Sequence, residues 1–352
     1  MIAPYMAVAL QTTVRHVAKR DEVVRNLDHI EAMIDLVTHI CSLELPVRLI
    51  TLGEGAIQGF VDEIANLTPA EYADTMAADV PGWETDRLGE KAKAKGCFIL
   101  GQLKTRNDKF PGRFFNTSFL IDPRGDVVWQ HQKNIVLHVE HSTTPHDVYD
   151  EWVAAYGDGL DTFFPVAKTE IGNIAGSVGV EGAFPECYRA FAMNGAEILY
   201  RGSLPEPWVS REIFEVQNRA RAMDNTAYMI ATNTGALIMP GPPGEAPTQV
   251  DGALGGRSAI YNYRGEVAAQ NQIVGDTYVA SPIDIEALRH YRQNAKFQNW
   301  IPYLRTELFN KLYAEPMWPK NTPTDQHADA DKVYADVIAK LLKNGTYTKS
   351  VF

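Results

Sequence analysis

Short apolar runs alternate along the chain with longer segments that have helical periodicity. Met6–Thr13 and Val47–Leu52 are rich in apolar and β-branched residues, which is typical of buried strands. Between them, Glu22–Leu43 carries an apolar residue at every third or fourth position and predicts a helix with one buried face. Trp83–Lys95 predicts a second helix, and Cys97–Leu103 predicts the strand that follows it. Strands and helices that alternate in this way indicate a layered α/β protein.

Two hairpins interrupt this alternation. Asp122–Asp126 contains both Pro and Gly between two apolar runs, and Arg264-Gly265 is a similar turn signal later in the chain. The paired strands are Phe114–Ile121 with Val127–Gln132, and Ser258–Tyr263 with Glu266–Gln270. Hairpins place antiparallel pairs in the sheets, so the pattern disfavours a purely parallel barrel.

The second half of the chain repeats the style of the first. Its predicted strands are Ile174–Val178, Ile198–Tyr200 and Tyr228–Thr232, and its predicted helices are Pro185–Asn194 and Arg211–Asn225. No Pro- or Ser-rich linker separates the halves, so we expect one layered domain over residues 1–290. Residues 291–352 form a C-terminal extension with an amphipathic helix, Ala330–Leu342. That helix either packs on another subunit or folds back on its own chain.

Charge and composition exclude some classes of partner. The 352 residues include 33 Lys and Arg against 44 Asp and Glu, a formal net charge of −11. A surface that binds nucleic acid needs an excess of basic charge, so nucleic acid is not an expected partner. Apolar residues make up 45% of the chain, as in packed globular proteins, but no run is long enough to span a membrane. Three cysteines are too few for a disulfide framework, and the short apolar N-terminal stretch fits a strand better than a signal peptide. We therefore expect a cytoplasmic protein.

Charged residues stand at the ends of two predicted strands, where layered α/β proteins commonly bind ligands. Glu54 follows the strand Val47–Leu52, and Lys133 follows Val127–Gln132. Gly176–Gly182 follows a third strand and precedes a helix, so its glycines allow the backbone to approach another group closely. Taken alone, Glu54 is explained equally well as a solvated loop residue and as a functional one, and Lys133 is better explained as an ordinary surface lysine.

Metal and nucleotide sites are not expected. Glu140 and four histidines suggest a metal site, but their spacing fits no compact helical motif and no cysteine is nearby. The four are His131, His138, His141 and His146. The chain also lacks a phosphate-binding glycine motif, and Ser177 lacks the context of a serine-hydrolase elbow. We expect neither a metal nor a cofactor.

A series of short motifs occurs in a fixed order along the chain. The motifs are Leu52-Gly53-Glu54 with Gly59-Phe60, Phe115-Asn116-Thr117-Ser118, Ile121-Asp122-Pro123-Arg124-Gly125, Lys133, Gly157-Asp158-Gly159, Glu170-Ile171-Gly172, Glu181-Gly182-Ala183-Phe184-Pro185-Glu186, Arg219-Ala220-Arg221-Ala222 with Asn225, and Gly256-Arg257-Ser258. Each motif alone is weak, but the ordered set is highly specific. Over about Met6–Ile285 the chain resembles the nitrilase superfamily of carbon–nitrogen hydrolases.

The resemblance implies a fold and a chemistry. The fold is a four-layer α-β-β-α sandwich, and residues 1–290 would be the carbon–nitrogen hydrolase domain. The family uses a buried Glu-Lys-Cys group in which the carboxylate removes the thiol proton and the thiolate attacks an amide or nitrile carbon. Glu54 matches the general base, although Gly53 stands where the family usually has Pro. Lys133 matches the lysine that stabilises the oxyanion.

The family usually has a second Glu, and its position depends on the anchor used for counting. The distance to Gly157-Asp158 favours Glu151, whereas the distance from Lys133 favours Glu140. We expect Glu151, because the downstream anchor follows the variable loop.

The nucleophile position is where the chain departs from the family. The family places its Cys five residues before Phe-Pro-Glu, and Phe184-Pro185-Glu186 therefore puts Gly179 at that position. Glycine has no side chain and cannot form the covalent intermediate. Cys187 lies eight residues later on a helix and should point elsewhere. The substitution is either engineered or natural.

The implied function is hydrolysis of a small non-peptide amide, either an aliphatic amide or an N-carbamoyl compound, by a chain that is inactive as written. One alternative is a pseudoenzyme that binds a small amide or acid, and another is an enzyme in which Glu54 activates water directly. A third is a nitrilase, but Val180-Glu181-Gly182 lacks the Trp and Asn that usually follow the nucleophile of nitrilases.

Aromatic and acidic residues near the motifs are candidates for contact with the substrate. They are Tyr149, Trp152, Glu181 and Trp208. Tyr149, Trp152 and Trp208 fit rim or subunit contacts equally well. The family usually pairs through helices beside the nucleophile strand, so we expect a homodimer or a higher homo-oligomer.

Overall fold

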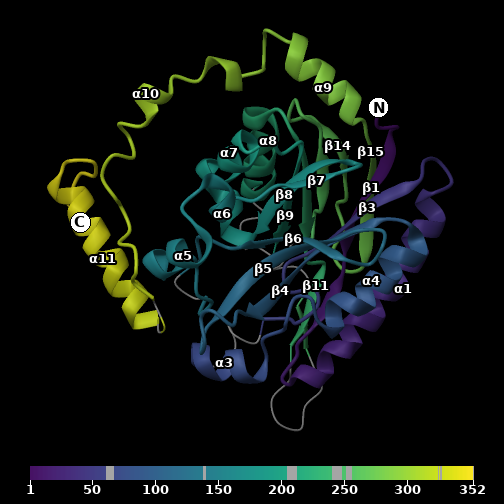
Figure 1. The fold of residues 1–352 in the computed structure, drawn as a ribbon, viewed down its shortest axis with the longest axis horizontal. Helices are drawn as coiled ribbons and strands as arrows, with labels where there is room; N and C mark the ends of the chain where they lie inside the picture. The colour runs from purple at the N-terminus through teal and green to yellow at the C-terminus, as the bar shows by residue number, and fades with distance from the viewer. Residues whose placement is uncertain are drawn as a thin grey trace.

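Two six-stranded β-sheets face each other between two layers of helices (Figure 1). This computed structural model describes residues 1–60, 67–137, 140–203, 212–239, 248–250, 256–323, 325 and 327–351. The arrangement is the four-layer α-β-β-α sandwich that the sequence predicts.

The first sheet combines parallel central strands with antiparallel edges. Its order is β15 (Thr277–Ile283), β1 (Tyr5–Gln11), β3 (Val47–Leu52), β4 (Phe98–Arg106), β5 (Phe114–Ile121) and β6 (Val127–Gln132). Strands β1, β3 and β4 are parallel neighbours, and β5 and β6 form the predicted hairpin. Gly125 occupies the turn with φ +96°, a value that glycine adopts without strain.

The second sheet has the same number of strands. Its order is β14 (Val267–Gln270), β13 (Ala259–Tyr261), β10 (Tyr228–Asn233), β9 (Ile198–Ser203), β8 (Gly172–Val178) and β7 (Ala167–Thr169). Strands β8, β9 and β10 are parallel, and β13 pairs with β14 as the second predicted hairpin. A small third sheet contains β12 (Thr248–Val250), β11 (Ala236–Met239) and β2 (Thr13–Arg15). The predicted strand Met6–Thr13 is therefore divided between two sheets.

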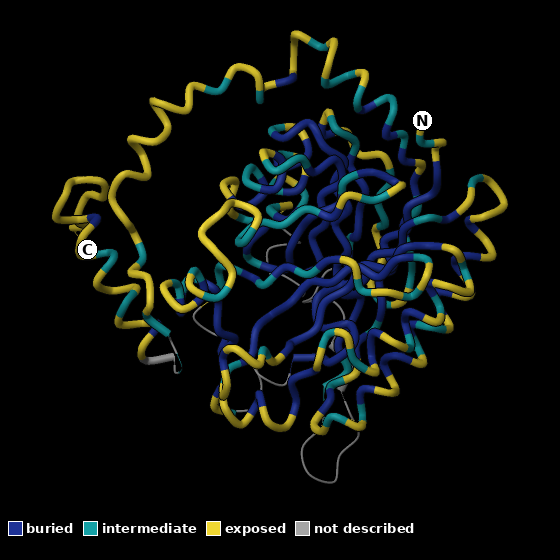
Figure 2. The backbone as a smooth tube through the Cα atoms, viewed as in Figure 1, coloured by how far each residue is buried: buried dark blue, intermediate teal, exposed yellow. Residues whose placement is uncertain are grey.

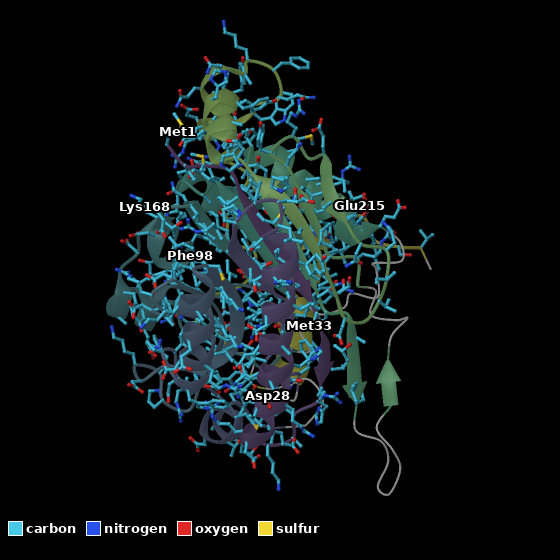
Figure 3. The ribbon with its side chains drawn as sticks, turned by 90° about the vertical axis from the view of Figure 1, so that its right-hand side faces the viewer. Met1, Asp28, Met33, Phe98, Lys168 and Glu215 are labelled. Atoms are coloured by element: carbon cyan, nitrogen blue, oxygen red, sulfur yellow. The ribbon has the colours of Figure 1, made fainter. Side chains whose placement is uncertain are left out.

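Helices cover the outer face of each sheet. The helices α1 (Val23–Cys41), α3 (Pro69–Thr75) and α4 (Trp83–Lys95) lie against the first sheet, and α7 (Pro185–Met193) and α8 (Ile213–Asn225) lie against the second. Figure 3 views the molecule from the side of α1, on which Asp28 and Met33 are labelled. Two short helices that the sequence analysis missed, α5 (Tyr149–Tyr156) and α6 (Leu160–Phe163), lie between β6 and β7 in the chain.

The core has two layers because the central strands are buried on both faces. In β1, Ala7 and Ala9 pack between the sheets, whereas Val8 and Leu10 pack under the first helix layer. Burial of a Val or Leu side chain stabilises the fold by roughly 1.5–3 kcal/mol. This explains why the central strands are continuous apolar runs rather than alternating ones.

The C-terminal extension leaves the sandwich after α9 (Ile285–Asn294), so the predicted boundary at residue 290 falls inside this helix. The following segment curves around the molecule and is largely exposed (Figures 1 and 2). It contains α10 (Thr306–Phe309) and α11 (His327–Lys343), the latter extending the predicted helix Ala330–Leu342 slightly at both ends. Helix α11 contacts its own extension, since Lys340 Nζ donates to Pro316 O at 2.6 Å. No helix in the described ranges is long and apolar enough to cross a membrane.

Candidate active site

Three strand ends from the two sheets meet at one buried point. Glu54 lies just beyond β3, Lys133 directly follows β6, and Gly179 directly follows β8. The side chains of Glu54 and Lys133 are only 4% and 1% exposed. Lys133 Nζ lies 3.3 Å from Glu54 Oε1, although β4 and β5 separate the two parent strands in the sheet. Both long side chains therefore reach across the sheet to form the pair.

Amide side chains from the two intervening strands span this gap. Gln102 of β4 accepts from Gly55 N at 2.8 Å and donates to Asn116 Oδ1 of β5 at 2.8 Å. Asn116 Nδ2 donates to Glu54 Oε1 at 2.9 Å, and the carbonyl of Asn116 accepts from Lys133 N at 2.8 Å. This continuous network fixes the orientation of the Glu54 carboxylate and the start of the Lys133 segment.

Lys133 also pairs with a second carboxylate. Its Nζ lies 2.6 Å and 2.8 Å from the two oxygens of Glu140, a residue that is 7% exposed. Burial opposes the charge on Lys133, but the carboxylates of Glu140 and Glu54 raise the pKa of this ammonium above its usual value. Burial alone would raise the pKa of Glu140, but the ammonium groups of Lys133 and Lys104 hold it below its usual value. Lys133 and Glu140 are therefore both charged at neutral pH.

The direction in which a side chain at position 179 would extend points to Glu54 and Lys133. A Cβ atom built on Gly179 would lie 2.7 Å from Glu54 Oε2 and 3.0 Å from Lys133 Nζ. The backbone of Gly179 has φ +56°, in the left-handed region, and opens the short 3-10 turn η2 (Gly179–Ala183). A side chain at this position would therefore point directly between the carboxylate and the ammonium, and the Glu54 carboxylate would have to move slightly to admit it.

The prediction that Glu151 joins the cluster is wrong, because Glu140 is the second glutamate that pairs with Lys133. Residues 149–156 form helix α5 rather than a loop, and Glu151 is exposed in its first turn, next to the buried Trp152. Leu137 N donates to Glu140 Oε1 at 3.1 Å, and Glu140 N donates to Leu137 O at 2.9 Å, so a tight turn directs the Glu140 carboxylate back to Lys133. The count back from Gly157-Asp158 selected Glu151 wrongly, because residues 149–156 form helix α5 and direct Glu151 to the surface.

The two glutamates make a matched pair of variants. Glu140→Gln is expected to lower the free energy of unfolding by roughly 1.5–3 kcal/mol, because it weakens charge-assisted bonds to a buried ammonium. Glu151→Gln is expected to change it by no more than about 0.5 kcal/mol, as for most surface substitutions. Urea denaturation of both variants measures the difference. Equal effects would show that the Glu140–Lys133 pair does not stabilise the site.

Glu181 belongs to the turn η2, and its carboxylate binds the ends of β6 and β8 rather than the Glu54–Lys133 pair. It is fully buried, and its carboxylate accepts from Asn134 N at 2.8 Å and lies 3.0 Å from His131 Nε2. It also accepts a short hydrogen bond from Ser177 Oγ. These contacts tie the end of β6 to the end of β8, which indicates a structural role in place of the predicted contact with substrate. Because the acid lies between Ser177 and His131, the three residues do not have the order of a serine triad.

The other predicted substrate contacts lie elsewhere. Trp152 is 3% exposed and packs against Phe110 and Phe115, and Phe115 is on the face of β5 opposite to Asn116. The Tyr149 ring stacks on Phe163, with the ammonium of a lysine in the C-terminal extension 4.8 Å away. Trp208 is outside the described residues. Trp152 instead lines a surface hollow of about 820 Å³ between α5 and the edge of β6.

Lys104, a buried cation on β4, is among the residues that the sequence analysis missed. Lys104 is 1% exposed and lies opposite Asn116 in the β4–β5 register, on the face that carries the cluster. A strand pattern in which polar residues alternate with apolar ones, as in Gln102-Leu103-Lys104, could have indicated that these side chains share a face. The sequence alone did not show that this face is buried.

The cysteines and histidines form no further centre of chemistry in the described residues. Cys41, Cys97 and Cys187 are buried and unbridged. Cys187 Sγ lies 3.9 Å from Glu181 Oε1, behind the turn, and burial raises the pKa of its thiol well above the usual value. Outside the gaps in the description, no three His, Cys, Asp or Glu side chains are placed to hold a metal ion, and His138 falls in one of those gaps.

The sequence of this chain matches a protein-family model and several individual proteins. The family model described as carbon–nitrogen hydrolase matches residues 10–293. The omega-amidase NIT2 of Xenopus tropicalis is 25% identical over 232 residues, which cover 63% of this chain and 74% of that protein. A formamidase of Bacillus cereus (strain Q1) is 27% identical over 234 residues, which cover 66% of this chain and 63% of that protein.

A solved structure shares the fold. The crystal structure of a carbon–nitrogen hydrolase from Helicobacter pylori G27 superposes with a TM-score of 0.65 at 16% identity. The match covers 89% of this chain and 99% of that chain. At this level of identity the likeness concerns the arrangement of the layers.

Proposed function

Because the chain belongs to the carbon–nitrogen hydrolase family of the nitrilase superfamily, we propose that Glu54, Lys133 and Glu140 form a binding site for a small non-peptide amide. We further propose that the chain as written does not hydrolyse that amide through a covalent intermediate. One observation carries the proposal: a side chain at Gly179 would start 2.7 Å from a Glu54 oxygen and 3.0 Å from the Lys133 ammonium. Glu54 and Lys133 thus flank position 179, which carries no nucleophilic side chain.

The proposed chemistry follows from these distances once a thiol stands at position 179. Glu54 accepts the thiol proton, and the sulfur forms a bond to the amide carbon while the carbonyl oxygen becomes an oxyanion beside Lys133. The C–N bond then breaks, and the leaving nitrogen takes the proton from Glu54. Water, deprotonated by the same carboxylate, adds to the thioester carbon. The C–S bond then breaks, the acid leaves, and the sulfur takes the proton back from Glu54.

The substrate class is proposed from the names of relatives and from the turn sequence. The relatives include an omega-amidase, a formamidase and a β-ureidopropionase, so amides and N-carbamoyl compounds both remain candidates. The turn Val180-Glu181-Gly182 lacks the Trp and Asn typical of nitrilases, which supports an amide over a nitrile.

A second candidate function is binding without catalysis. Glu54, Lys133 and Glu140 satisfy one another and Asn116 without a thiol, so the cluster is a stable resting state as it stands. Buried charged groups destabilise a protein unless each has close partners of opposite charge, and Glu54, Lys133 and Glu140 have such partners in one another. Binding of a small amide or acid by the unsubstituted chain, without turnover of aliphatic amides, N-carbamoyl compounds or nitriles by either that chain or Gly179→Cys, would favour this function.

The experiment compares the unsubstituted chain with Gly179→Cys on aliphatic amides, N-carbamoyl compounds and nitriles. Ammonia release from the first two classes by Gly179→Cys alone is the expected result. Preference for nitriles would refute the amide assignment. Turnover by the unsubstituted chain at the same rate as Gly179→Cys would instead indicate that Glu54 activates water directly.

We also propose a homo-oligomer, supported by the exposed apolar side chains on the helices beside the Gly179 strand. Phe184 and Met193 of the α7 region and Val216 and Met223 of α8 are between 38% and 62% exposed. Covering such side chains favours association. Light scattering at micromolar concentration should give at least twice the chain mass of 39.1 kDa, and a monomer would contradict the proposal.

A further inference from the structure

The start of helix α5 is capped by a residue from the C-terminal extension. Val148 precedes this helix and makes no side-chain cap, so it leaves the first N–H groups of α5 without the usual acceptor. Asn321 supplies an acceptor across 171 residues, because its Oδ1 accepts from Asp150 N at 2.9 Å. Its Nδ2 donates in return to Asp150 Oδ2 at 2.7 Å. After its exposed curve, the extension therefore meets the body of the molecule at α5 (Figure 1).

Asn321 suits this place by its backbone as well as by its side chain. It has φ +56°, and Asn is one of the few residues with a side chain that adopts the left-handed region readily. With this backbone, Asn321 N donates to His146 O at 3.0 Å. One residue of the extension thus binds both the start of α5 and the loop that precedes it.

The loop between Glu140 and α5 is compact and buried. Thr144 N and Oγ1 each donate to Asp147 Oδ2 at 2.8 Å, and Asp147 N donates to Thr144 O at 3.1 Å. Thr143, three residues after Glu140, donates from its N to Phe114 O at 2.8 Å. Because these residues form one closed turn, the position of the start of α5 sets the position of the residues next to Glu140.

A second contact of the extension reaches the other end of this turn. Asp325 Oδ1 lies 2.8 Å from Arg113 Nη1, and the same nitrogen donates to Thr143 Oγ1 at 3.4 Å. A partly exposed ion pair stabilises little by itself. Asn321, with three hydrogen bonds to the loop and the helix, is therefore the main contact.

We propose that Asn321 is a positioning residue of the site: by closing residues 141–148 against α5, it keeps the Glu140 carboxylate on the Lys133 ammonium. The inference rests on the proposed function, since Glu140 belongs to the proposed binding site. The segment of the extension around Asn321 is then part of the architecture of the site.

Hydrogen exchange of the full chain, followed by mass spectrometry, tests the step from Asn321 to the loop. Asn321→Gly removes the cap without strain, because glycine adopts φ +56° freely. It is expected to raise exchange by about tenfold or more both in α5 and in residues 140–148, and to leave β8 unchanged. Asn344→Gly makes the same substitution at another exposed residue of the extension and should change none of these segments. Faster exchange in α5 alone would overturn the proposal, because Asn321 would then only cap the helix.

A reciprocal exchange of side chains provides the rescue. Asn321→Asp keeps an acceptor for Asp150 N but places two carboxylates face to face, so it is expected to speed exchange of residues 140–148 by a smaller factor. Adding Asp150→Asn supplies an amide donor to the new carboxylate and should restore slow exchange. Exchange that stays fast in this double variant would overturn the proposal.

A double-mutant cycle tests the step from the loop to Lys133. Glu140→Gln lowers the urea midpoint of the otherwise unsubstituted chain by weakening the bonds to Lys133. In the Asn321→Gly chain the same substitution is expected to lower the midpoint by about half as much or less, since Glu140 is no longer held on the ammonium. In the Asn344→Gly chain the full shift should remain. Equal shifts in the Asn321→Gly and Asn344→Gly chains would overturn the proposal. Neither measurement needs amide turnover, so failure of the proposed function leaves both results readable.

Discussion

Gly179→Cys is expected to raise the rate of amide hydrolysis by about three orders of magnitude or more. The reason is that groups that act as one unit lose nearly all of their effect when the nucleophile is missing. The distances of 2.7 Å and 3.0 Å from the Cβ position to Glu54 and Lys133 place the new sulfur within reach of both. Ammonia release from a small amide, measured with equal amounts of unsubstituted and variant chain, gives the ratio.

The control for this variant is Gly179→Ala. Any non-glycine residue at φ +56° costs about 1–2 kcal/mol and pushes against the Glu54 carboxylate. Both variants should therefore be destabilised to the same extent, but only the cysteine variant should gain activity. Equal activity in the two variants would mean that strain at the turn, rather than the thiol, changes the rate.

Lys133→Met is expected to lower the free energy of unfolding by about 3–5 kcal/mol, because it leaves two buried carboxylates without their shared cation. In the Gly179→Cys chain it should also abolish hydrolysis, since no ammonium then faces the oxyanion. Urea denaturation measures the first effect and ammonia release the second.

A compensating variant separates loss of charge from loss of packing. Glu140→Gln added to Lys133→Met removes one of the stranded carboxylates and should recover part of the lost stability. Lys168→Met replaces an exposed lysine of β7 that pairs with Asn173 near the start of β8, whereas Gly179 follows the end of β8. It should change stability by no more than about 0.5 kcal/mol. A loss below about 1 kcal/mol in Lys133→Met would contradict the buried ion-pair arrangement.

Much of the fold follows from patterns that are local in the sequence. The hairpin turn at Asp122–Asp126 carries its own signal, because Pro and Gly restrict the backbone there whatever surrounds them. Helix α1 carries one too, since its buried residues recur at helical spacing. By contrast, Thr13–Arg15 continues an apolar run but pairs with β11, more than 220 residues away, and no local pattern reports such a pairing.

Some residues of the candidate site also follow from local sequence patterns, and others do not. Glu54, Lys133 and Gly179 stand directly after strands, so the order of strands and the family motifs were enough to bring them together. The position of Glu140 depends on how the loop after Lys133 folds back, and a count between sequence anchors does not report that.

The residues that support the site were not predicted. Gln102 and Asn116 act through the register of β4 and β5. Each depends on which face of a strand its residue occupies and on what packs there. A single sequence specifies neither until the sheets are assembled.

The most direct test of the account is ammonia release from a small aliphatic amide by the chain with Gly179 in place. The account predicts no release above that of buffer, because Gly179 offers no nucleophile between Glu54 and Lys133. Release at about 1 per second or more, within the usual range of enzymes, would contradict it and would assign the chemistry to water activated by Glu54.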